Sequence, residues 1–223
     1  SADAVQIVAG GTSVFEVDSN SRISLSNNDS GTDNTVFGFL AGAAGLSGGT
    51  DNVLIGDYAG NAMTSADHNI AIGADALLTH TTGGYNIAIG TGAMKDTNAG
   101  STSLASSDNT FIGYSSASGT WTDVASNFNV AVGNNTMDAA MDGALGNTAI
   151  GTESLSALTS GDYNTAIGYQ AGNDITTGAN NVLIGKEAGD AITDGANNIA
   201  IGVEALTTAN SGENGNIVIG TSA

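Results

Sequence analysis

The chain has 223 residues, with 33 Gly, no Pro and no Cys, and 22 acidic residues against three Lys or Arg give a formal net charge of −19. So few cations cannot neutralise a run of phosphates, which excludes nucleic-acid binding. The lack of Cys excludes disulfides, thiolate metal sites and thiol nucleophiles, and no apolar run approaches the ~18 residues of a membrane-spanning helix. We therefore expect neither a nucleic-acid partner nor membrane insertion.

Residues 1–33 precede the main pattern of the chain, and we predict that they form an N-terminal β-hairpin segment. Within them, residues 12–25 alternate apolar and polar side chains on both sides of a Ser- and Asn-rich turn. This alternation is typical of a strand–turn–strand unit.

From residue 34 onward, the pentamer Asn-x-x-(large apolar)-Gly recurs eleven times. Its Asn residues are Asn34, Asn52, Asn69, Asn86, Asn109, Asn129, Asn147, Asn164, Asn181, Asn198 and Asn216. Successive Asn numbers mostly differ by seventeen or eighteen, but two consecutive copies are longer, from Asn86 to Asn109 and from Asn109 to Asn129. Repetition at a fixed period indicates a repeat architecture in which each unit packs on its neighbours.

Three positions of each copy carry the structural information. A large β-former stands three places after the Asn, a Gly follows it at once, and a small residue stands seven places after the Asn. A unit with a basal period of seventeen is too short for two packed helices, and its Gly-rich, β-branched composition favours strands. We therefore predict an all-β fold, a parallel β-solenoid or β-roll of about eleven coils spanning residues 34–223. Its structural repeat includes Ile55, Gly56, Ile72, Gly73, Ile89, Gly90, Ile167, Gly168, Ile184, Gly185, Ile201 and Gly202.

The short strand of each coil has two faces, because successive side chains point to opposite sides. Residues one and three places after the Asn are Thr, Val or Ile followed by the large apolar residue. We predict that this face is the coil interior, with Ile55, Ile72 and Ile89 in a continuous buried spine. The residues two places after the Asn are also apolar, which predicts a stripe through which copies of the chain pack, unless a loop of the same chain covers it. The predicted oligomer stripe is Leu54, Ala71, Ala88, Phe111, Ala131, Ala149, Ala166, Leu183 and Ala200.

Segments such as Asn-Ile-Ala-Ile-Gly at 69–73 resemble the Asn-Ser-Val-Ala-Ile-Gly repeats in the head of trimeric autotransporter adhesins. The segment Asn-Thr-Ala-Ile-Gly-Tyr-Gln-Ala at 164–171 is more similar to repeats of phage tail-fibre proteins, and residues 12–25 are similar to the opening segments of such fibres. The resemblance implies a homotrimeric rod with the Val and Ile positions inside and the Ala column toward the partners. The period is seventeen, where adhesin heads usually have fourteen, so we expect a different turn geometry and cross-section. The lack of a stalk and anchor favours the phage-like interpretation. We expect the chain to be a segment of a longer fibre.

The two longer copies place their extra residues in the return turns, near 95–108 and 117–128. Stacking brings these turns to the same edge of the rod. The second contains Trp121, the only tryptophan, followed by Thr122 and Asp123. An exposed aromatic side chain on an elaborated loop is typical of a receptor contact, so these three are candidate receptor-contact residues. The alternative is that Trp121 folds back to anchor its own loop.

Carboxylates such as Asp51, Asp67, Asp108 and Asp162 lie in the turns just before the pentamers. Turn carboxylates can bind Ca²⁺ through their oxygens, but neither the EF-hand spacing nor the glycine-rich nonapeptide of calcium-binding β-rolls occurs. We interpret them as a solvated surface that keeps a fibre soluble and expect no cofactor, with bound Ca²⁺ as the alternative.

Catalytic motifs are weak in this sequence, and we expect no enzymatic activity. Ser47 stands in a Gly-x-Ser-x-Gly pattern, but in a return turn rather than at a strand-to-helix elbow. His68 and His80 occupy different places in their coils, which makes surface turns their default position. No pair of carboxylates stands out for glycan hydrolysis.

These patterns predict a structural and adhesive segment of an extracellular fibre, on a virion tail fibre or a cell-surface appendage. Its partners would be further copies of the chain, three in total, and a cell-surface glycan or protein receptor. The alternatives are a bacterial or archaeal surface adhesin or filament, an ice-binding solenoid and a glycan-degrading spike. Ice binding would use the partial Thr ladder twelve places after the Asn, which is interrupted in five coils.

Overall fold

The computed structural model describes residues 5–9, 12–17, 23–24, 31–97, 105–208 and 212–223, with side chains from residue 31 onward. The N-terminal part contains an antiparallel sheet in the order β1-β2-β3, formed by β1 (Val5–Ala9), β2 (Thr12–Val17) and β3 (Ile23–Ser24). The predicted strand–turn–strand unit corresponds to β2 and β3, and β1 pairs with the other edge of β2.

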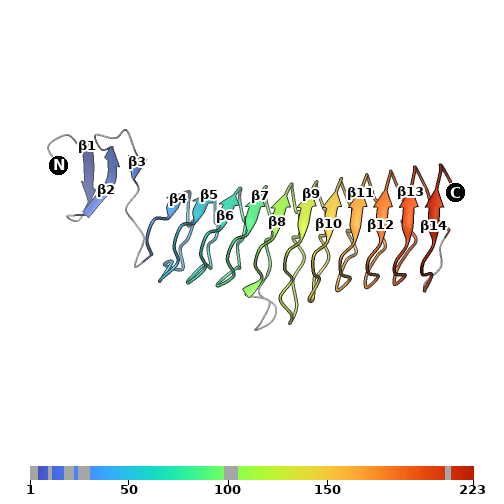
Figure 1. Cartoon of the computed structure of the whole chain (residues 1–223). Coiled ribbons are helices and arrows are strands. Elements are labelled where there is room, and N and C mark those ends of the chain that lie inside the picture. The colour runs from blue at the N-terminus through green and yellow to red at the C-terminus, as the bar shows by residue number, and fades with distance from the viewer. Residues whose placement is uncertain (1–4, 10–11, 18–22, 25–30, 98–104, 209–211) are drawn as a thin grey trace.

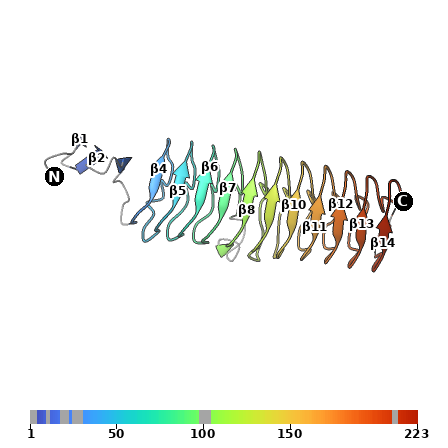
Figure 2. The ribbon, with the colours of Figure 1, turned by 45° about the horizontal axis from the view of Figure 1, so that its top comes forward.

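The rest of the chain forms a parallel β-solenoid, as predicted, with one three-residue strand in each coil (Figure 1). The strands are β4 (Thr35–Phe37), β5 (Val53–Ile55), β6 (Ile70–Ile72), β7 (Ile87–Ile89), β8 (Thr110–Ile112), β9 (Val130–Val132), β10 (Thr148–Ile150), β11 (Thr165–Ile167), β12 (Val182–Ile184), β13 (Ile199–Ile201) and β14 (Ile217–Ile219). About ten turns connect them, and the mean period of about 18 exceeds the predicted seventeen because of the longer coils. A second view shows the coils stacked along one axis (Figure 2).

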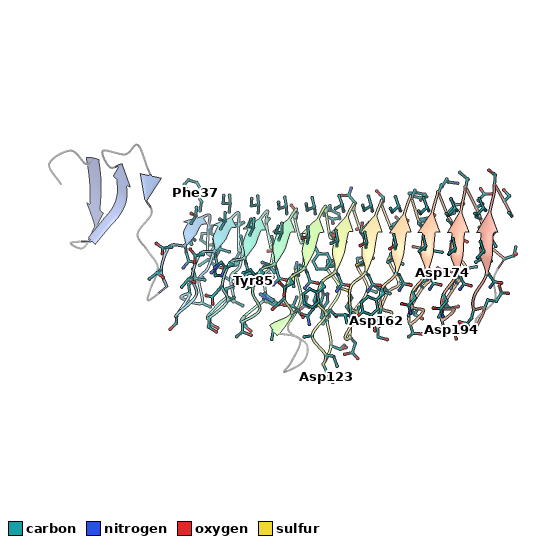
Figure 3. All side chains as sticks on the ribbon, in the orientation of Figure 1. Phe37, Tyr85, Asp123, Asp162, Asp174 and Asp194 are labelled. Atoms are coloured by element: carbon teal, nitrogen blue, oxygen red, sulfur yellow. The ribbon has the colours of Figure 1, made fainter. Side chains whose placement is uncertain are left out.

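The longer turns do not disturb the sheet. Strand β8 pairs in parallel with both β7 and β9, and each residue lies opposite the equivalent residue of the next coil. The second longer turn extends its coil at the edge away from the strands, where Asp123 lies near the tip (Figure 3).

The two faces of the strands are reversed relative to the sequence prediction. All residues of the predicted oligomer stripe, from Leu54 to Ala200, are fully buried inside the single chain and form part of its core. The large residues three places after the Asn point outward instead, and Ile55, Ile150 and Ile184 are 38 %, 41 % and 37 % exposed. The prediction of a buried Ile spine was therefore wrong, and so was the assignment of the Ala column to partner chains.

The physical reason is a ladder of buried asparagines, formed by the first residue of each pentamer. In one rung, the Oδ1 atom of Asn164 accepts hydrogen bonds from the backbone N–H (3.1 Å) and the Nδ2 group (2.9 Å) of Asn181. The Nδ2 group of Asn164 donates to Oδ1 of Asn147 (3.0 Å) and to the carbonyl of Gly178 (2.8 Å). The Asn-to-Asn pair of bonds recurs at all ten steps. Because a buried amide with full hydrogen bonding is tolerated, Asn and the residue two places later both face inward.

The narrow interior admits at most one large side chain per coil from two facing positions, two and eight places after the Asn. Where Leu54 occupies the first position, Gly60 occupies the second, and a Cβ at Gly60 would lie 2.7 Å from a Leu54 methyl carbon. The next coil reverses the sizes, with Ala71 facing the buried Leu77. The two positions thus share one volume, and the side chain that fills it comes from either of them.

The Gly that ends each pentamer is required by the neighbouring coil. All eleven of these glycines have φ between 132° and 148°. A Cβ on Gly168 would overlap the carbonyl group of Gly185 in the next coil. Either the positive φ or the close approach would favour glycine at this position, and both are present.

The shared volume in the core can be tested by exchanging the side-chain sizes at its two facing positions. Leu54→Ala should destabilise the chain by about 2–5 kcal/mol through the cavity that it leaves, and Gly60→Leu by about 1–3 kcal/mol through overpacking. The double variant should recover most of the loss, because Ala71 and Leu77 already form this pair with φ of 52° at Leu77. Urea unfolding of the four proteins measures the coupling, and additive losses would contradict the shared volume.

The asparagine ladder predicts a large penalty for a single truncation. Asn164→Ala should cost about 3 kcal/mol or more, because it leaves the Gly178 carbonyl and the Asn181 N–H without their partner in the interior and removes one of the two hydrogen bonds to Oδ1 of Asn147. The matched control is Asn180→Asp, on an exposed position where Asp51 and Asp108 stand in other coils. The control should stay within about 0.5 kcal/mol of the parent in the same unfolding measurement.

Candidate functional site

The outward face of the strands carries an uncharged surface along the rod, which we call the apolar strip. It consists of the residues one and three places after each Asn, all of them Thr, Val, Ile or Phe. The residues nearer the Gly include the more exposed ones, such as Ile167 at 37 % and Phe37 at 64 %. Figure 3 shows side chains projecting in a row above the strands, beginning at Phe37. With a coil spacing of about 4.8 Å, eleven coils give the strip a length of roughly 50 Å.

Trp121 does not form part of an exposed loop. Its side chain is completely buried, and its ring packs edge-on against Phe111 with centroids 5.9 Å apart. The assignment of Trp121 as a receptor contact was therefore wrong, and the alternative that it anchors its own loop is confirmed. Thr122 is half-buried, whereas Asp123 and the neighbouring Val124 are exposed.

The sequence contained a signal for this burial. Trp121 stands twelve places after its Asn, and the equivalent residues Leu46 and Met141 are also buried. In the shorter coils, the same core column falls eleven places after the Asn, as at Ile175 and Ile192. Aligning coils on the core column, instead of on a Thr ladder, would have placed Trp121 inside.

Several turn carboxylates connect neighbouring coils. The Oδ1 atom of Asp67 accepts a hydrogen bond from the backbone N–H of Thr50 (2.7 Å), and Oδ1 of Asp162 accepts one from Leu145 (2.9 Å). Within the residues that the structure describes, no group of three or more His, Asp or Glu is placed to hold a metal ion. These two carboxylates thus satisfy backbone donors across the coil interface.

Both lysines pair with acidic side chains, Lys95 with Asp75 at 3.0 Å. Lys186 lies 2.9 Å from Glu187 and 3.9 Å from Glu204, and its hydrogen bond with Glu187 raises the pKa of the ammonium group. Burial raises the pKa of the Asp190 carboxyl, with the negative charges of Glu187 and Asp174 adding to the shift. Negative charge is thus concentrated on surfaces other than the apolar strip.

Three of the five Thr residues considered for ice binding are engaged within the solenoid. The hydroxyls of Thr64, Thr159 and Thr176 donate to the backbone carbonyl of the Thr in the next coil, at 3.2, 3.0 and 3.2 Å. All three side chains are partly buried. Their hydroxyl protons therefore point along the rod rather than to an external surface.

The two histidines have different environments. His68 lies at the surface, with Nε2 3.5 Å from Asp51 and its ring stacked on Tyr85. His80 is fully buried, which corrects the expectation of a surface turn. Its Nε2 lies 3.0 Å from the Gly83 carbonyl and its Nδ1 3.2 Å from Oγ1 of Thr97. Burial lowers the pKa of His80 to about 4, so the ring is neutral at pH 7.

No family model matches the chain, and no curated protein or solved structure shows significant similarity to it. None of the described segments is a helix long and apolar enough to cross a membrane. The likeness of the repeats to phage tail fibres therefore stays a resemblance of sequence pattern.

Buried His80 predicts a specific acid sensitivity. Because its pKa is about 4 in the folded chain and 6.5 ordinarily, the unfolded chain binds the proton first as pH falls. The contribution of neutral His80 to the free energy of unfolding should be fully present above pH 6.5. It should decline toward pH 4 by up to about 1.4 kcal/mol per pH unit. His80→Met removes this dependence, since Met63 fills the equivalent core position one coil earlier. The stability difference between the two proteins, measured by urea unfolding from pH 7.5 to 4, should change across this interval, and a constant difference would contradict the assignment.

Proposed function

We propose that the chain is a shaft segment of an extracellular fibre, built by the side-by-side association of several copies through the apolar strip. The observation that carries this proposal is the partial exposure of two continuous columns of Thr, Val, Ile and Phe along eleven coils. Large contiguous apolar surfaces on soluble proteins commonly mark sites of association. The contact between copies, which the sequence analysis assigned to the Ala column, is thus assigned to the opposite face of the strands.

The length of the strip supports this assignment. It is roughly 50 Å long, and its two columns stand about 6.6 Å apart along the strand, so a width of about 10 Å gives each copy roughly 500 Å². A standard interface takes ~800 Å² from each partner, so the contact between copies would extend beyond the strip onto the flanking turns. The strip contains no charged side chain, although the chain carries a net charge of −19. Like-charged chains can approach one another most easily through a neutral surface. Three copies are expected from the resemblance to trimeric fibres.

The internal bonding suits a mechanical function. Strand hydrogen bonds and the asparagine ladder run from β4 to β14, parallel to the rod axis. Bending would have to strain these bonds at several coils together, because each coil contacts its neighbours along its whole perimeter. The exposed tip around Asp123 and Val124 is the part of the longer coils available for an adhesive contact.

The association is tested by placing charge on the strip. Ile150→Lys with Ile167→Lys introduces two cations on adjacent coils at side chains that are 41 % and 37 % exposed. We expect light scattering to give about three times 21.8 kDa for the parent and the mass of one chain for the variant. The matched control, Ser160→Lys with Thr177→Lys, adds the same charge to exposed turns of the same two coils and should leave the mass unchanged. A monomeric parent protein would overturn the proposal.

A further inference from the structure

Three exposed aromatic rings stand in one line along the rod. Tyr85, Phe128 and Tyr163 each come directly before the Asn of their coil, and they are 60 %, 59 % and 56 % exposed. They belong to the coils of β7, β9 and β11, so successive rings are two coils apart. At the spacing of parallel strands, this interval is about 9.6 Å. We call these residues the aromatic row.

The spacing is maintained through the irregular part of the sequence. Between Tyr85 and Phe128, the chain contains both longer turns, yet β7, β8 and β9 stay in register residue for residue. Asp123, in the second of these turns, lies well away from the strands (Figure 3). The backbone positions of the row therefore have a uniform interval in space that the unequal separations along the sequence do not reveal.

Local backbone preference does not account for the rings. The position before the Asn has φ of 55–60° in the coils of the row, a left-handed conformation that bulky residues adopt at a cost. Most other coils use residues that tolerate it, such as Asp51, Asp108 and Asn180. Tyr and Phe thus replace better-suited residues, at alternate coils and with most of the ring exposed. A residue type that the local backbone conformation disfavours is typical of a functional position.

Neighbouring residues position two of the rings. The Tyr85 ring stacks on His68 with centroids 4.7 Å apart, on the side away from Phe128. A Cβ on Gly146 would lie 2.7 Å from the Tyr163 ring, so this ring lies over Gly146 of the intervening coil, on the side toward Phe128. Between Tyr85 and Phe128, the same position holds the exposed carboxylate of Asp108.

From this arrangement, we propose that the aromatic row binds an extended, uncharged β-1,4-linked polysaccharide that lies along the rod. Aromatic rings pack well against the C–H faces of sugar rings, as they do against other apolar surfaces. The two-coil interval is close to the disaccharide repeat of such a chain, so alternate sugars would meet successive rings. Asp108 would accept hydrogen bonds from the sugar hydroxyls between the rings, and the net charge of −19 disfavours polyanionic glycans.

The test uses the full chain with cellohexaose and chitohexaose as probes, in calorimetric titrations. The parent should bind at least one of them, and maltohexaose, whose α-linked chain is curved, should bind at least tenfold more weakly. Tyr85→Asn, Phe128→Asn and Tyr163→Asn each remove one ring but keep a residue that fits the backbone, as Asn180 does. Each substitution should lower the affinity about three- to tenfold.

The matched control removes exposed aromatics outside the row, Tyr114→Asn and Tyr169→Asn, and should leave the affinity unchanged. The proposal is overturned if neither β-linked probe binds, or if the triple row variant binds as the parent does. It is also overturned if the triple variant lowers the solution mass of the protein, because the row would then belong to the contact between copies. Failure of the apolar-strip test alone would leave the glycan result intact, since the two tests alter different residues.

Discussion

The buried asparagine of each coil is the constraint on which the rest of the structure depends. Its amide has donors and acceptors that only the adjacent coils can satisfy, as Asn164 does with Asn147 and Asn181. An interior amide without these bonds would be strongly unfavourable, so no coil can shift in register independently of the others. The ladder therefore fixes the register of the strands and decides which strand residues face inward and which face the solvent.

The period, the strands and the glycine column were predictable because each follows from local chemistry. A large β-former followed by Gly at every repeat is enough to place the strands and the turn after them. The orientation of the strand was not predicted, because hydrophobicity alone assigns the Ile of Asn-Ile-Ala-Ile-Gly to the core. In a two-residue alternation, the opposite choice buries Ala and Asn and exposes both Ile residues. The hydrogen-bonding capacity of Asn, together with the small volume of so short a coil, decides in favour of the second arrangement.

The same limit on volume accounts for the largest side chains of the core. Phe111 and Trp121 share a coil and pack edge-on against each other, where another coil holds the smaller pair Leu54 and Met63. The coil of Phe111 is one of the two with extra residues, but the still longer coil that begins at Asn86 holds only Ala88, Met94 and Thr97 at the equivalent core positions. A longer turn therefore does not by itself bring a larger core. Around Trp121, the residues that reach the surface include Thr120, Asp123 and Val124.

Because the interior is so restricted, differences between coils that bear on function are expected at outward positions, where the fold does not dictate the residue type. The column of the apolar strip three places after the Asn varies little, which fits the association that we propose. The position before the Asn is instead limited by its left-handed backbone, which favours Asp, Asn and Gly. Tyr85, Phe128 and Tyr163 depart from that preference without any gain in burial. Neither the backbone nor the core explains their presence, so their contribution must be sought in what the outer surface contacts.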